Sequence, residues 1–151
     1  MGILNGKTNR ESEASSTSSR GQLMGHRMLA LLGGGEASST HLVSDPVDGS
    51  LRALKHAMRG PDEGDDRLDR VIEEHEIVRR LDHAGVRRVH RLQRVRSRFR
   101  LREIGLFQQY VDGPTLDQWS PTNGTSILGV MEQLGHAVAH VHERGLVHGS
   151  I

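Results

Sequence analysis

The segment from residue 28 to residue 57 contains three short apolar runs separated by turn-forming residues. The first run, MLALL, leads into GGGEASST, and a Pro-Val-Asp-Gly sequence divides the second run from the third. Apolar runs of this length, bounded by glycine, proline and aspartate, are typical of β-strands joined by tight turns. The pattern therefore predicts strands at about residues 28–33, 39–45 and 50–57.

A helical period follows these strands. In residues 66–82, largely apolar side chains recur at spacings of three and four residues, and the other positions are mainly Glu and Arg, as in an amphipathic helix. The apolar stripe consists of Leu68, Val71, Ile72, His75, Val78 and Leu81. Two more strands are predicted at residues 89–95 and 104–111. A second helix is predicted at about residues 126–144, with Gly145 as its stop. These five strands and two helices predict an α+β fold.

Composition bounds the class of protein. Residues 1–22 are rich in Ser, Gly, Asn, Thr and charge, so we expect a disordered tail over residues 1–27. The chain has 151 residues, no cysteine and a formal net charge of +1, which exclude a disulfide framework and give no overall attraction to nucleic acid. No run approaches the roughly 18 apolar residues of a membrane span, and the N-terminus lacks the apolar core of a signal peptide. A cytoplasmic location without a membrane partner is expected.

Five segments stand in an order and spacing that one protein family shares. LGGGEASST contains Leu32, Gly33 and Gly35, and RALK ends with Lys55. Glu74 lies in the predicted helix, and LFQQYVDGPTL and HVHERGLVHGSI follow. Together these segments resemble a protein kinase domain of the bacterial serine/threonine type. They match its glycine-rich loop, its strand lysine, the glutamate of its regulatory helix, its adenine-holding hinge and the helix before its catalytic loop.

The resemblance implies an architecture and a site. Residues 28–113 would form the kinase-like N-terminal lobe, a five-stranded antiparallel sheet plus one helix, and the hinge. Residues 114–151 would form the first helices of a C-terminal lobe truncated at the catalytic loop. Lys55 would neutralise phosphate charge and be held by Glu74, with Glu73 and Glu76 as nearby alternatives. Other positions matched to nucleotide contacts are Leu32, Gly33, Gly35, Thr40, Ala53, Gln109 and Val111, with Gln108 as the gatekeeper and Ser38 in place of the third glycine.

The catalytic position departs from the family pattern. Ser150 stands where a kinase has the aspartate that accepts the substrate's proton, and a serine hydroxyl carries no charge at neutral pH. The residues that hold magnesium would come after Ile151. We therefore expect weak or absent ATP binding, no bound magnesium and no phosphate transfer by this chain. The alternatives are a pseudokinase-type scaffold or protein-interaction module, and a fragment of a split kinase gene.

Three further patterns bear on partners. His136 and His140 are four residues apart, but no carboxylate completes a helical zinc motif, so no metal site is expected. Arginines alternate from Arg94 to Arg102, which predicts a β-hairpin with a basic face. Such a face could bind RNA, an acidic peptide or anionic lipid, but a solvated hairpin balanced by the acidic residues 62–66 is the preferred interpretation. An apolar stripe on the terminal helix predicts self-association or a protein partner: Ile127, Leu128, Met131, Leu134, Val138 and Val141.

Overall fold

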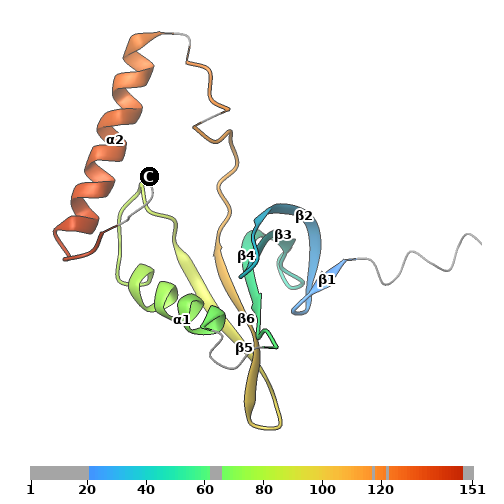
Figure 1. Cartoon of the computed structure of the whole chain (residues 1–151). Coiled ribbons are helices and arrows are strands. Elements are labelled where there is room, and N and C mark those ends of the chain that lie inside the picture. Colours follow the sequence, from blue (N-terminus) through green and yellow to red (C-terminus); the bar gives the residue numbers. More distant parts are fainter. Residues whose placement is uncertain (1–20, 62–65, 117, 122, 148–151) are drawn as a thin grey trace, which may run out of the picture.

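The described part of the chain consists of a curled antiparallel sheet and two helices (Figure 1). The computed structural model describes residues 21–61, 66–116, 118–121 and 123–147. The strands lie in the order β1-β2-β3-β4-β6-β5, and every neighbouring pair is antiparallel. The elements are β1 (Gln22–Leu23), β2 (His26–Gly34), β3 (Ser39–Ser44), β4 (Leu51–Met58), α1 (Arg67–Val78), β5 (Val89–Ser97), β6 (Arg100–Gln109) and α2 (Gly124–His142). The predicted α+β class is confirmed.

The sheet has six strands, so the predicted number of five is wrong. The additional strand, β1, pairs with the start of β2 through a two-residue turn at Met24 and Gly25, whose φ angles are 51° and 84°. Turns with two positive φ angles match the twist of a hairpin. Part of the predicted tail, residues 22–23 and 26–27, therefore lies in strands. A two-residue strand beside a Ser/Gly-rich stretch leaves too weak a pattern to recognise.

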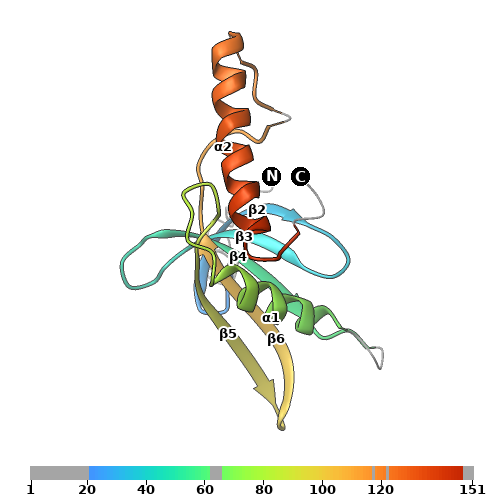
Figure 2. The same ribbon diagram turned by 90° about the vertical axis from the view of Figure 1, so that its left-hand side faces the viewer.

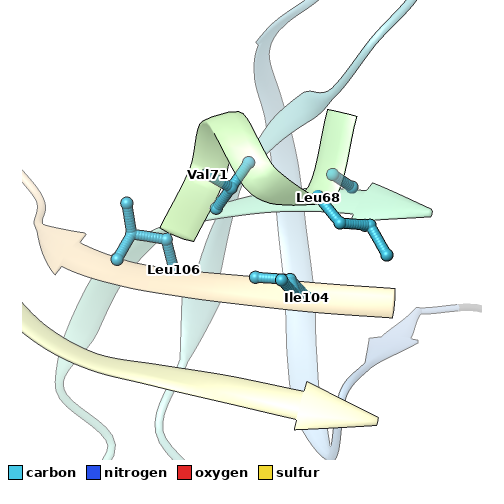
Figure 3. Packing of buried hydrophobic residues seen from close by; sticks show 5 residues of the cluster. Leu68, Val71, Ile104 and Leu106 are labelled. Atoms are coloured by element: carbon cyan, nitrogen blue, oxygen red, sulfur yellow. The ribbon is translucent and has the colours of Figure 1, made fainter. Parts of the chain in front are cut away.

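The two faces of the sheet carry separate clusters of buried side chains. On one face, α1 places Leu68 and Val71 against Ile104, Leu106 and Ala57, as Figure 3 shows for the labelled residues. Side chains alternate across a strand, so the neighbours of these residues on β4 and β6 point to the opposite face. That face holds a cluster of Val43, Leu54 and Phe107, against which Leu23 and Met24 pack. The N-terminal hairpin thus covers the face that α1 leaves open.

The second helix lies apart from the sheet (Figures 1 and 2). It begins two residues earlier than predicted because Asn123 is its N-cap: the Asn123 side chain accepts a hydrogen bond from the Ser126 backbone N–H at 2.8 Å. Near its other end, Ala137 lies against Gly85 in the loop after α1. None of the helices in the described ranges is long and apolar enough to cross a membrane.

Candidate functional site

An ion pair connects the middle of the sheet to α1. Lys55 lies on β4, between β3 and β6, and its Nζ is 2.5 Å from Oε2 of Glu74 on α1. The side chains are 29% and 30% exposed, so both charges are partly withdrawn from water. Side chains two residues apart on a strand point to the same face of the sheet. Lys55 therefore points toward α1, as does Ala57, which packs in the cluster with Leu68 and Val71. The pair is a fixed cation and carboxylate at the edge of the core.

A buried amide completes the surroundings of Glu74. Gln108, on β6, is 7% exposed and donates a hydrogen bond from Nε2 to Glu74 Oε1 at 3.1 Å. Each carboxylate oxygen of Glu74 therefore has its own donor, one charged and one neutral. Buried polar groups require partners, and this bond supplies one for the Gln108 amide. Sequence reasoning placed Gln108 at the gatekeeper position but gave no signal that its partner is Glu74.

The neighbouring glutamates have other surroundings. Glu76 Oε2 accepts a hydrogen bond from Nε of Arg79 at 2.7 Å, one turn along α1. Glu73 lines a pocket between the two helices. Of the three candidate glutamates, Glu74 is the one that pairs with Lys55 in the structure.

The residues matched to the glycine-rich loop lie in line with Lys55. Strand register places Gly33 opposite Thr40 and Thr40 opposite Lys55, which forms a row across β2, β3 and β4. Gly35 follows β2, and its N–H donates to the Ser38 carbonyl at 2.9 Å. A Cβ at Gly33 or Gly35 would meet no atom within 4 Å, so the backbone there is open to an approaching anion. Leu32 lies at a register shift of β2 and is exposed.

The residues matched to the base site lie on β4, two residues before Lys55, and at the end of β6. Ala53 is buried on β4, opposite Gln108 on β6. The Gln109 N–H already donates to the Arg88 carbonyl at 2.8 Å, and Val111 is exposed. The remaining predicted site residue, Ser150, lies outside the described residues.

A pocket of about 700 Å³ lies between α1 and α2 and reaches Glu74 of the ion pair. Its polar lining includes Glu73, Glu74 and Gln108. The apolar lining comes from both helices and from the segments that follow them: Ile77, Val78, Leu81, Val86, Leu134, Ala137, Val138, Val141, Leu146 and Val147. Sequence reasoning missed this pocket, although the two apolar stripes that line it were recognised separately.

The histidines of α2 have partners of other kinds. His136 Nε2 lies 3.9 Å from Oε1 of Glu132, and the His140 ring lies 5.0 Å from that of His83. Burial, then the nearby Arg144, lowers the pKa of His140. In the described part of the chain, no group of three His, Cys, Asp or Glu residues is arranged to hold a metal ion.

No protein-family model matches the chain, and no match to a curated protein was found. The functional interpretation therefore depends on the geometry around Lys55 and Glu74.

Proposed function

We propose that this chain is a protein-kinase-like domain that binds a nucleoside triphosphate through Lys55 and the loop after β2. The observation that carries the proposal is the ion pair between Lys55 and Glu74, which joins a sheet lysine to the helix packed on that sheet. Kinases hold ATP phosphates with a strand lysine that a helix glutamate positions. Here Gln108 adds a second donor to the same glutamate.

The choice of lysine at position 55 supports this role. The chain has 20 Lys and Arg residues in total, and only Lys7 and Lys55 are lysines. Arginine makes the stronger paired hydrogen bonds to a carboxylate, whereas lysine offers a compact charge with three donors. An ammonium group can keep its contact with Glu74 and still donate to a phosphate oxygen. A purely structural pair in this arginine-rich chain would gain more from arginine.

The proposed activity is binding without phosphate transfer. Gly33 and Gly35 would let the phosphates approach the backbone without meeting a side chain, and Lys55 would neutralise part of their charge. Ser150, in the place of the catalytic aspartate, has no carboxylate to accept the proton of a substrate hydroxyl. Nucleotide would then act as a structural ligand of the domain.

Titration with a fluorescent ATP analogue tests the proposal. Lys55→Met should weaken binding about tenfold or more, because a hydrogen bond to a charged group contributes about 1.5–3 kcal/mol. Arg52→Met is the matched control, since Arg52 is on the same strand but lies near Asp45 on the opposite face. Equal affinity of wild type and Lys55→Met, or an equal loss in both variants, would reject the site.

A second candidate function is protein interaction through α2. Ile127, Leu128 and Met131, in its first half, are all exposed, and Leu128 is 71% exposed. Exposed apolar side chains on successive turns mark an interface. Light scattering should detect self-association that Leu128→Lys removes. A wild-type chain that stays monomeric at high concentration would count against this candidate.

A further inference from the structure

The hairpin of β5 and β6 ends in a fully exposed aromatic side chain. Phe99 lies in the turn between the two strands and is 101% exposed. Figures 1 and 2 both show this end of the hairpin projecting beyond the rest of the sheet. An exposed Phe gains nothing from the core of its own domain.

The backbone of this turn is also unfavourable for the residues in it. Arg98 and Phe99 have φ angles of 47° and 69°. Hairpin turns with two positive φ angles favour Asn-Gly, because side chains with a Cβ are strained there and bulky ones most of all. Neither packing within the domain nor the backbone conformation of the turn thus explains why a phenylalanine stands at position 99.

Unneutralised positive charge surrounds the tip. Five exposed arginines lie on the turn and the adjoining strand ends: Arg94, Arg96, Arg98, Arg100 and Arg102. Among the described residues, none of these guanidinium groups forms an ion pair. The carboxylate of the hairpin, Glu103, accepts from His56 at 2.8 Å, and Asp66 of the acidic stretch pairs with Arg70. Asp66, one of the acidic residues expected to balance the arginines of the hairpin, therefore pairs with a residue of α1 instead.

We propose that the tip of the β5–β6 hairpin binds the surface of an anionic membrane, with Phe99 inserted among the lipids and the arginines on the phosphate headgroups. In a bilayer, the charged headgroups lie outside the apolar acyl chains. Phe99 at the end of the hairpin would reach the acyl chains, and the arginines behind it would lie at the level of the anionic headgroups. The tip is convex and meets a flat lipid surface first. Proteins bind single-stranded nucleic acid by stacking successive bases on several aromatic side chains, whereas residues 94–102 contain one, Phe99. The proposal takes the anionic-lipid alternative for the basic hairpin in place of the solvated hairpin and the expectation of no membrane partner.

Vesicle sedimentation tests the proposal with the full chain. Binding is expected to phosphatidylcholine vesicles containing roughly 30% phosphatidylserine, to weaken with salt, and to be much lower on pure phosphatidylcholine. Phe99→Ser should reduce the binding constant several-fold. The matched control is Val47→Ser, which removes a 92% exposed apolar side chain from the β3–β4 turn and should leave binding unchanged.

A second variant separates binding from folding. Arg98→Asn with Phe99→Gly gives the turn its preferred residues, so the protein should unfold at a higher temperature while binding vesicles less. A third variant, Phe99→Trp in a Trp119→Phe background, should shift its emission to the blue on anionic vesicles. Three results would each overturn the proposal: no binding to anionic vesicles, binding that ignores Phe99, or tighter binding to a single-stranded oligonucleotide lost in the same variants.

Discussion

Replacing Gly105 with alanine should loosen the N-terminal hairpin from the sheet. A Cβ at position 105 would overlap the sulfur of Met24 and lie 2.9 Å from Cδ1 of Leu54. Leu54 is fully buried in the cluster with Val43 and Phe107. Met24 is a flexible side chain at the edge of the cluster, so it must give way. Its displacement would disturb the turn that holds β1 on the sheet.

The size of this effect follows from two opposing terms. Overpacking a core site costs about 1–3 kcal/mol. Replacing glycine by alanine inside a strand gains roughly 0.5–1 kcal/mol. In the wild type, Gly105→Ala should therefore lower the free energy of unfolding by about 1–2 kcal/mol. After Met24→Ala the overlap with the sulfur is gone, and the vacated space lets Cδ1 of Leu54, 2.9 Å from the new Cβ, move aside. The same substitution should then be close to neutral.

Urea denaturation of the wild type, both single variants and the double variant measures the coupling between the two sites. We expect a coupling energy of about 1–3 kcal/mol, with the double variant more stable than the sum of the single effects. A coupling below about 0.5 kcal/mol would mean that the Met24 side chain does not occupy the space beside Gly105. The placement of β1 over this face would then be refuted.

Three further substitutions probe other parts of the structure. Gln108→Leu removes the donor to Glu74 Oε1, so urea denaturation should show a free energy of unfolding lower by about 1 kcal/mol. The same variant should weaken nucleotide binding less than Lys55→Met does. Burial lowers the pKa of His41 from 6.5, so the unfolded chain binds more protons as pH falls through that value. The free energy of unfolding should therefore fall from about pH 7 toward about pH 5, less steeply in His41→Gln. Gly85→Val places atoms on Ala137, so hydrogen exchange in α2 should accelerate while the sheet stays protected.

Most elements of the fold were predictable because their patterns are local. The strands predicted at residues 39–45 and 50–57 match β3 and β4 to within one residue at each end. The first helix was predicted over residues 66–82 but ends at Val78. The prediction ran too far because the turn after Val78 keeps Leu81 at the spacing of the apolar stripe. Apolar spacing fixes the face of a helix better than its end.

The missed features depend on contacts between distant residues. β1 forms because Leu23 and Met24 find an apolar face that Gly105 leaves open, about 80 residues later in the sequence. The bond between Gln108 and Glu74 joins β6 to α1, and no spacing rule connects the two positions. The sequence could propose Glu73, Glu74 or Glu76 for Lys55, since all three lie on one helix. Their different directions around α1 separate them only in three dimensions.

Labelling with an ATP analogue that carries a reactive acyl phosphate tests the proposed nucleotide site most directly, because such a probe acylates a lysine beside the bound phosphates. The chain has two lysines, Lys55 and Lys7, so mass spectrometry of the labelled protein distinguishes the proposed site from a lysine outside it. The proposal predicts rapid acylation of Lys55 that excess ATP prevents and Glu74→Gln slows, with slow labelling of Lys7 that ATP does not change. Equal labelling of the two lysines, unaffected by ATP, would contradict it.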